Sequence, residues 1–185
     1  GIPVVTSPER GFMPTAADLL PHLPRAQVVL LNSPLNPAGT VIEPELLREI
    51  CEAIVAENRQ RLDAGRRPIT LIYDQVYWQL THGDYVHRTP VELVPEMARY
   101  TVLVDAISKS WAATGLRVGW CVAPPYVVSR MKPLVGHMGA WAARAEQLST
   151  AELLDDDATA GAYMATFKAA LHRRLAMLYQ GLQQM

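Results

Sequence analysis

Three short apolar segments constrain the fold of this chain more than any other feature of its sequence. They span Gln27–Asn32, Ile69–Tyr73 and Thr101–Val104, and in each of them hydrophobic residues follow one another without polar alternation. Segments of this kind are typical of parallel strands that are covered on both faces of a sheet. Because stretches with helical periodicity separate them, the sequence predicts an α/β domain with a mostly parallel sheet.

Apolar residues at helical spacing predict two long helices. The first begins at Pro44, whose missing N–H costs nothing in a first turn, and ends at Gly65. The second begins at Asp155–Asp157, where negative charge suits a helix N-terminus, and runs to the end of the chain. Weaker patterns predict strands at Ile2–Val5 and Arg117–Val122, helices at Ala16–His22 and Tyr126–Lys132, a short helix at Val91–Arg99 interrupted by Pro95, and a loop and helix within Gly136–Ser149.

Composition and charge exclude several classes of function. A formal net charge of −1 over 185 residues gives no electrostatic footprint for nucleic acid or for an anionic membrane. No apolar run reaches the roughly 20 residues of a membrane-spanning helix, and the first residues lack the features of a signal peptide. Cys51 and Cys121 belong to no paired motif and the five histidines show no ligand spacing, so we expect a reducing cytoplasm and no metal site.

Unusual polar residues follow each of the three apolar segments. Asn36 comes after the first segment, Asp74 and Tyr77 after the second, and Lys109 after the third. Parallel strands place their carboxyl ends on one edge of a sheet, which is where ligands of such domains bind. The sequence therefore predicts a site at this edge, with a lysine beside small hydroxyl residues that suits imine formation. A lone lysine after a strand is usually a solvated loop residue, so the prediction depends on the whole group.

Four motifs, taken in order, resemble those of the class I/II aminotransferases, fold-type I enzymes that use pyridoxal 5′-phosphate. The separations agree with that family: 38 residues from Asn36 to Asp74, 35 from Asp74 to Lys109, and 8 from Lys109 to Arg117. The resemblance implies a three-layer sandwich, the central part of the large domain of such an enzyme, incomplete at both ends. The motifs are Asn36-Pro37-Ala38-Gly39, Asp74-x-x-Tyr77, Ser108-Lys109 and Gly115-x-Arg117-x-Gly119.

The resemblance implies a role for each matched residue around the cofactor. Lys109 would form the imine with pyridoxal phosphate and afterwards move a proton at the substrate α-carbon. Asp74 would keep the pyridine nitrogen protonated, because a nearby negative charge favours the cationic form. Asn36 and Tyr77 would donate hydrogen bonds to the phenolic oxygen of the cofactor. The predicted catalytic residues are thus Lys109, Asp74 and Tyr77.

The phosphate group of the cofactor requires an arginine and hydroxyl groups. By resemblance, Arg117 and Ser108 match the phosphate contacts of the family, whereas Ala106 stands where the family commonly has a serine. The missing hydroxyl weakens cofactor binding by about 1 kcal/mol if no water replaces it.

The resemblance also implies parts that this sequence does not provide. We expect residues 1–154 to form part of the cofactor-binding domain and residues 155–185 to form a helix that leads toward a C-terminal small domain. An upstream phosphate loop, an aromatic residue that stacks on the pyridine ring, and an arginine for the substrate carboxylate have no match here. The chain would thus be an inactive fragment of a homodimeric enzyme that exchanges an amino group between an amino acid and a 2-oxo acid.

Three other interpretations of the same residues stay open. The lysine framework also serves carbon–sulfur lyases and other amino-acid lyases, and no residue of this chain separates them from an aminotransferase. A regulator with an aminotransferase-like fold could bind the cofactor through such a domain without turnover. Finally, the lysine, aspartate and arginine could be incidental to an ordinary α/β domain.

Overall fold

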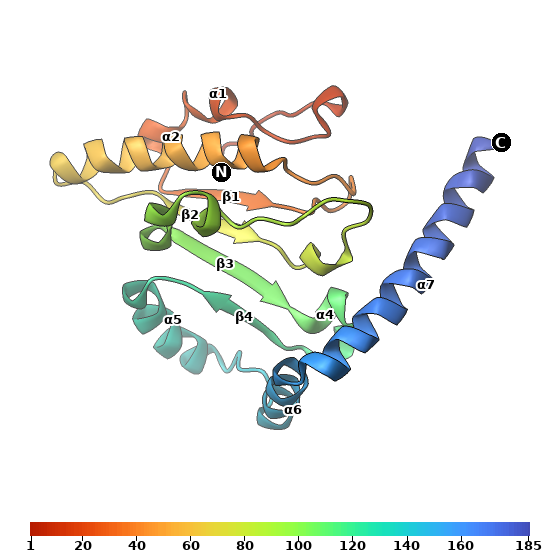
Figure 1. Cartoon of the computed structure of the whole chain (residues 1–185). Coiled ribbons are helices and arrows are strands. Elements are labelled where there is room, and N and C mark those ends of the chain that lie inside the picture. Colours follow the sequence, from red (N-terminus) through yellow and green to blue (C-terminus); the bar gives the residue numbers. More distant parts are fainter.

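The computed structural model describes all 185 residues and contains one four-stranded sheet (Figure 1). The strands β1 (Val28–Asn32), β2 (Thr70–Asp74), β3 (Thr101–Ala106) and β4 (Gly119–Val122) lie side by side in chain order. β1, β2 and β3 are parallel, whereas β4 is antiparallel to β3. The α/β class and the mostly parallel sheet predicted from the sequence are confirmed.

The register of the parallel strands aligns their carboxyl ends. Asn32 at the end of β1 lies opposite Asp74 at the end of β2, and Asp74 lies opposite Val104 in β3. The short helix α4 (Ile107–Ser110), which contains Lys109, begins directly after β3. The segments after all three strands therefore emerge at one edge of the sheet.

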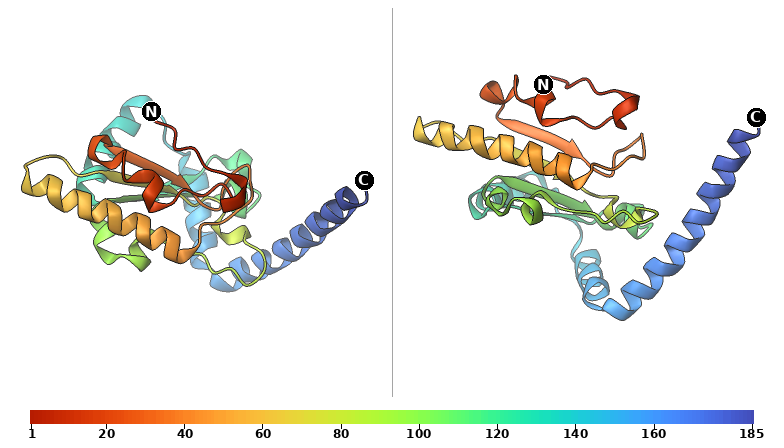
Figure 2. Two further views of the ribbon diagram at one scale, coloured as in Figure 1. Left: turned by 90° about the horizontal axis from the view of Figure 1, so that it is seen from above. Right: turned by 45° about the horizontal axis from the view of Figure 1, so that its top comes forward.

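The helix α2 (Pro44–Asp63) covers one face of the sheet (Figure 2). Its apolar side and alternate residues of β1 and β2 belong to a cluster of 16 buried residues. Ile50 and Ile54 of α2 and Leu71 and Tyr73 of β2 are completely buried in this cluster. Burial of such side chains is the main favourable contribution to folding, so α2 and the first two strands form the stable centre of the domain.

The remaining elements before α5 are short. Thr15 and Thr89 begin α1 and α3 with capping boxes, in which the threonine and an acidic residue each accept a hydrogen bond from the other's backbone N–H. Their bounds and those of the five 3₁₀ turns are α1 Ala16–Leu19, α3 Pro90–Leu93, η1 Pro8–Arg10, η2 Leu23–Arg25, η3 Trp78–Leu80, η4 Pro95–Arg99 and η5 Thr114–Leu116.

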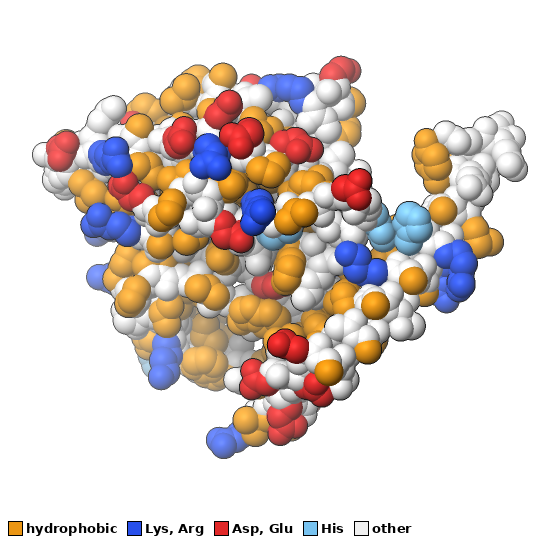
Figure 3. Space-filling model, viewed as in Figure 1, with side chains coloured by type: hydrophobic (Ala, Val, Ile, Leu, Met, Phe, Trp, Pro, Cys, Tyr) orange, Lys and Arg blue, Asp and Glu red, His pale blue; other side chains and the backbone are white.

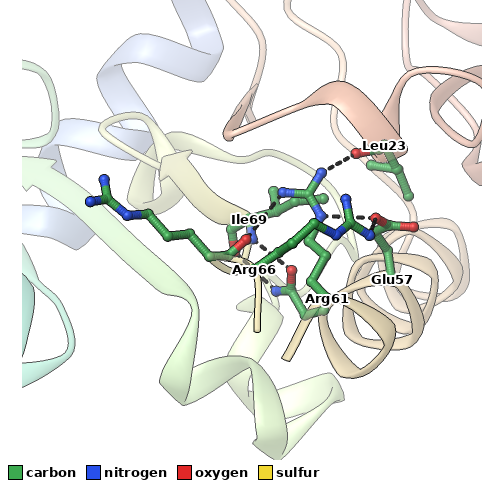
Figure 4. A network of polar contacts seen from close by, with 7 residues as sticks. Leu23, Glu57, Arg61, Arg66 and Ile69 are labelled. Atoms are coloured by element: carbon green, nitrogen blue, oxygen red, sulfur yellow. Dashed lines mark hydrogen bonds and ion pairs between the residues drawn. The ribbon is translucent and has the colours of Figure 1, made fainter. Parts of the chain in front are cut away.

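Two buried polar side chains of α2 attach the helix to the segments that lead into β1 and β2. Asn58 is fully buried and bonds twice to the backbone of Ile69: its Oδ1 accepts from the N–H at 2.6 Å, and its Nδ2 donates to the carbonyl at 3.0 Å. Arg61 is paired with Glu57 at 2.8 Å and donates to the carbonyl oxygen of Leu23 at 2.6 Å (Figure 4). Since unpartnered buried polar groups are costly, these bonds fix how α2 lies on the strands.

The other face of the sheet is open along β1. Val28 and Leu30 are 52% and 68% exposed, while their neighbours Val29 and Leu31 are buried. The apolar sequence of this strand predicted cover on both faces, and for β1 that expectation is wrong. The alternating burial shows that only the face toward α2 is covered.

Three helices complete the chain: α5 (Pro125–Met138), α6 (Arg144–Asp155) and α7 (Asp157–Gln183). α7 projects away from the sheet, and its C-terminal half carries exposed hydrophobic side chains such as Leu178 and Leu182 (Figures 1 and 3). Its N-terminal half contacts the segment after Lys109, because the Tyr163 hydroxyl donates to the carbonyl of Trp111 at 3.1 Å and the two rings stack. None of the helices is both long and apolar enough to span a membrane.

Two predicted strands differ from the structure. Residues Ile2–Val5 form no strand, and Pro3 among them lacks the N–H that a sheet ladder requires. The strand predicted at Arg117–Val122 begins at Gly119, because Arg117 adopts a left-handed conformation with φ of 58° at the end of a 3₁₀ turn. A left-handed residue cannot continue a strand.

The predicted helices are present with altered bounds. The helix predicted at Ala16–His22 ends at Leu19, and the helix predicted at Tyr126–Lys132 continues through Pro133 to Met138. The long C-terminal helix predicted to begin at Asp155–Asp157 is confirmed as α7, which begins at Asp157. Asp156 caps it by accepting from a backbone N–H, and Asp155 is the last residue of α6. The interruption predicted at Pro95 is confirmed, since η4 begins there after α3 has ended.

Replacing Asn58 tests the attachment of α2 to the sheet. We expect Asn58→Ala to lower the free energy of unfolding by about 2–4 kcal/mol, because the buried N–H and carbonyl of Ile69 lose their partners. Urea unfolding followed by circular dichroism measures the change. Gln60→Ala, at an exposed position of the same helix, is the matched control and should cost less than about 0.5 kcal/mol. Equal effects of the two substitutions would contradict this role of Asn58.

Candidate active site at the carboxyl edge of the sheet

Lys109 lies in the first helical turn after β3 and faces Tyr77. Its side chain is partly buried, and its Nζ lies 5.8 Å from the centre of the Tyr77 ring. None of the ion pairs or side-chain hydrogen bonds of the chain includes this ammonium group. A partly buried ammonium without a counter-ion has no evident structural role, and amines of this kind are candidates for chemistry.

The hydroxyl of Tyr77 lies near Asn36, which comes from the loop after β1. Nδ2 of Asn36 is 3.4 Å from the Tyr77 oxygen, and the backbone N–H of Asn36 donates to Oδ1 of Asn32 at 2.9 Å. Asn32 in turn donates from Nδ2 to the carbonyl of Asp74 at 3.1 Å. Side-chain as well as backbone hydrogen bonds therefore join the ends of β1 and β2. They bring the amide of Asn36 and the phenol of Tyr77 together at the edge of the sheet that carries Lys109.

Asp74, at the end of β2, has one carboxylate oxygen free. Its Oδ1 accepts from the backbone N–H of Val76 at 3.1 Å, and no hydrogen bond of the chain engages Oδ2. The side chain is only partly buried. A carboxylate held at one oxygen and open at the other can accept a further N–H donor at the same edge as Lys109.

Ser108 and Arg117, which are predicted to bind the phosphate, form no side-chain hydrogen bond with the other predicted site residues. Ser108 is partly buried in α4 beside Lys109. Arg117 is exposed, and its guanidinium donates to the carbonyl of Thr114 at 3.0 Å. The structure thus brings Lys109, Tyr77 and Asn36 together with Asp74 on the same edge, but it shows no contact between Arg117 and these residues. Phosphate binding by Ser108 and Arg117 stays a prediction.

Gly119 allows β4 to approach the strand that leads into α4. A Cβ atom at Gly119 would lie 3.1 Å from the carbonyl oxygen of Asp105 and 3.3 Å from the Cβ of Ala106. Most real Cβ contacts are longer than these distances. Close packing therefore requires glycine at position 119, because the side chain of a larger residue would displace the segment that positions Lys109.

Four residues of this region were not found by sequence reasoning. Asp105 is half buried, and burial raises the pKa of its carboxyl group, although hydrogen bonds from Ala106, Trp78 and Gln75 oppose the shift. Burial also lowers the pKa of His87, with Glu92 acting in the opposite direction. The only sequence signal was an acidic residue, Asp105, at the end of an otherwise apolar strand. The four residues are Gln75, Trp78, His87 and Asp105.

A cleft of about 1230 Å³ lies elsewhere, at the amino edge of the sheet between α5 and the turn after α2. Its lining includes Arg67, Tyr100 and Arg130 but none of the predicted site residues. Its size therefore does not identify it as the active site, and the chemistry points to the opposite edge.

The side chains at the carboxyl edge fit pyridoxal phosphate. An amine without an ion pair (Lys109), a carboxylate with one open oxygen (Asp74), and an amide beside a phenol (Asn36 and Tyr77) match the carbonyl carbon, the pyridinium nitrogen and the phenolic oxygen of that cofactor. Each donor or acceptor has capacity left for a ligand. The edge could therefore hold this cofactor without breaking a strong internal bond.

Comparison with known proteins gives one family. The model of the family "Aminotransferase class I and II" matches residues 1–185. An aspartate aminotransferase of Geobacillus stearothermophilus is 32% identical over 114 residues, which are 62% of this chain and 26% of that protein. A probable aspartate/prephenate aminotransferase of Thermus aquaticus is 28% identical over 187 residues, covering 100% of this chain and 45% of that protein.

Solved structures with the same fold are similar over almost the whole chain. The aspartate aminotransferase of Thermus thermophilus with maleate aligns with a TM-score of 0.87 and 26% identity, covering 99% of this chain and 44% of that one. An N-succinyldiaminopimelate aminotransferase of Mycobacterium tuberculosis aligns with a TM-score of 0.83 and 26% identity, with the same coverage. The chain thus spans less than half the length of these proteins.

Gly119 and Gly115 offer a matched pair for testing the close approach of β4. We expect Gly119→Ala to lower the free energy of unfolding by about 1–3 kcal/mol, because the new methyl group must displace the backbone of Asp105. Gly115→Ala meets no atom within 4 Å and should stay within about 0.5 kcal/mol of the unsubstituted protein. Urea unfolding measures both changes. If Gly119→Ala were as harmless as Gly115→Ala, the contact with β3 would not constrain this segment.

Proposed function

We propose that this chain, which belongs to the aminotransferase class I and II family, is part of a pyridoxal-phosphate-dependent aminotransferase that moves an amino group from an amino acid to a 2-oxo acid. Its relatives and structural neighbours carry aminotransferase names, which supports transfer over other reactions of the same cofactor. Their names include aspartate and prephenate, so dicarboxylic and related amino acids are the first substrates to test.

The observation that carries the proposal is the placement of Lys109. Its amine lies over Tyr77 with no ion pair, at the same edge as a carboxylate with a free oxygen. These groups come from separate strands and loops, and parallel pairing alone brings them to one edge. An incidental lysine would have no reason to be accompanied by these particular partners.

Lys109 is the proposed catalytic base and the point of attachment of the cofactor. Pyridoxal phosphate, when bound, supplies the electron sink that makes the α-hydrogen of an amino acid acidic. The Lys109 amine would hold the cofactor and, once free, would take up and return the proton at the substrate α-carbon, which is the general acid–base step of transfer.

The other residues supply charge and orientation. Asp74 would use its free Oδ2 to accept from the pyridinium N–H, and its negative charge would keep that nitrogen protonated. Tyr77 and Asn36 would donate to the phenolic oxygen. Arg117 and Ser108 would bind the phosphate, and Ala106 supplies no hydroxyl there.

For the whole enzyme, we propose the domain organisation that the sequence predicts. Residues 1–154 would form part of the cofactor-binding domain, and residues 155–185 would lead along α7 toward a small domain. The exposed hydrophobic side chains of α7 support a further domain or a second subunit beside it, as a homodimer would provide. We also propose a cytoplasmic location, as the two cysteines outside any paired motif suggest.

A substrate screen of the complete gene product tests the proposal. With pyridoxal phosphate bound, a panel of amino donors and 2-oxo acids should give amino transfer, measured as the new amino acid and the new oxo acid in equal amounts. Lys109→Ala should lower kcat by at least about 100-fold, because the proton-transferring group is lost. Lys132→Ala, at an exposed lysine of α5, is the matched control and should keep kcat.

Three outcomes of this screen would contradict the proposal. Release of ammonia or sulfide without a new amino acid would indicate a lyase. Cofactor binding without turnover of any donor would indicate an effector-binding domain. Full turnover by Lys109→Ala would remove the lysine from the mechanism.

A further inference from the structure

The carboxylate of Asp105 at the end of β3 accepts a hydrogen bond from the indole of Trp78 in the turn after β2. Asp105 is the next to last residue of β3, and Trp78 directly follows Tyr77 in the chain. Nε1 of Trp78 donates to Oδ2 of Asp105 at 2.8 Å, while Oδ1 accepts from the backbone N–H of Ala106 at 2.7 Å. Both oxygens of this carboxylate are therefore occupied by N–H donors of the chain, which distinguishes it from the open carboxylate of the site.

His87 lies beside the same indole and contacts the side chain of Gln75. The His87 ring lies 5.8 Å from the ring of Trp78, and its Nε2 is 3.2 Å from the side-chain oxygen of Gln75. The backbone N–H of Gln75 donates to the carbonyl of Val104 in β3 at 3.1 Å. Trp78 is thus held both at its N–H and against its ring, by groups that are themselves attached to the sheet.

Tyr77 lies between two fixed neighbours, while its own hydroxyl has a single, long contact. On one side, the N–H of Val76 donates to Asp74 at 3.1 Å and its carbonyl accepts from the Ser110 hydroxyl at 3.3 Å. On the other side, Trp78 is hydrogen-bonded to Asp105 of β3. The position of the Tyr77 ring over Lys109 therefore depends on the residues before and after it.

We propose that Asp105 and Trp78 are positioning residues that hold the hydroxyl of Tyr77 where it can donate to the phenolic oxygen of the bound cofactor. This inference rests on the proposed function of the site. A donor at the phenolic oxygen stabilises its negative charge, and does so most when the lysine nitrogen joined to the cofactor has lost its proton. Loss of the bond between Trp78 and Asp105 should therefore make that nitrogen hold its proton to higher pH.

Trp78→Phe removes the indole N–H and leaves every charge of the site in place. In the complete, cofactor-loaded protein we expect it to raise the midpoint of the pH-dependent absorbance change by at least about half a pH unit. Trp141→Phe, at a tryptophan that is 54% exposed, is the matched control and should leave the midpoint unchanged. A purely structural role of Trp78 would lower thermal stability without moving the midpoint, and that result would overturn the inference.

Crystal structures of the cofactor-free protein give a second readout. In Trp78→Phe and Asp105→Ala we expect the Tyr77 hydroxyl to lie beyond hydrogen-bonding distance of Asn36. Asp105→Asn keeps an acceptor for the indole and should restore the original position of Tyr77. Tyr77 in its original place in Trp78→Phe and Asp105→Ala would contradict the positioning role.

Different results would refute the proposed function and the positioning role of Trp78 and Asp105. A wild-type protein that shows no cofactor absorbance, and no cofactor attached to Lys109 after reduction with borohydride, would refute the proposed function and this inference with it. A wild-type protein that titrates normally, together with a Trp78→Phe variant of the same midpoint, would refute the positioning role alone.

Discussion

Parallel pairing of β1, β2 and β3 is the constraint on which the rest of the structure depends. Because the three strands run in one direction, the loops that follow them begin at one edge of the sheet. Asn36, Asp74 and Lys109, widely separated in the sequence, are brought to that edge for this reason alone. None of them belongs to the hydrophobic core, which α2 forms against the other parts of the strands. Core and site can therefore be altered separately.

Hydrogen bonds join the loops at the site to one another. The Ser110 hydroxyl bonds to the carbonyl of Val76, the indole of Trp78 bonds to Asp105, and the side chain of Asn32 bonds to the carbonyl of Asp74. Each of these bonds joins the ends of two different strands or their loops. Polar bonds have strict distances and angles, so they orient side chains more specifically than hydrophobic packing does. This suits a site whose groups must each meet one atom of a cofactor.

Much of the fold could be predicted from the sequence because its apolar segments are short, continuous and separated by helical patterns. The site residues could be predicted because their types, order and separations resemble one enzyme family. The antiparallel direction of β4 could not be predicted, because the 12 residues between β3 and β4 are long enough for either a reversal or a crossover. The left-handed Arg117 and the contact between Trp78 and Asp105 could not be predicted, since both depend on how loops close in space. Patterns of residue type predict elements and motifs, but they do not predict which side chains 27 positions apart will meet, here one in β3 and one in the turn after β2.

Chemical trapping of the bound cofactor tests the role of Lys109 most directly. The complete protein is loaded with pyridoxal phosphate, reduced with borohydride, digested and examined by mass spectrometry. A single reduced adduct is predicted on the peptide that contains Lys109, and it should disappear in Lys109→Ala while the protein stays folded. An adduct on Lys132 or Lys168 instead, or a protein that borohydride leaves unlabelled, would contradict the assignment of this edge of the sheet as the active site.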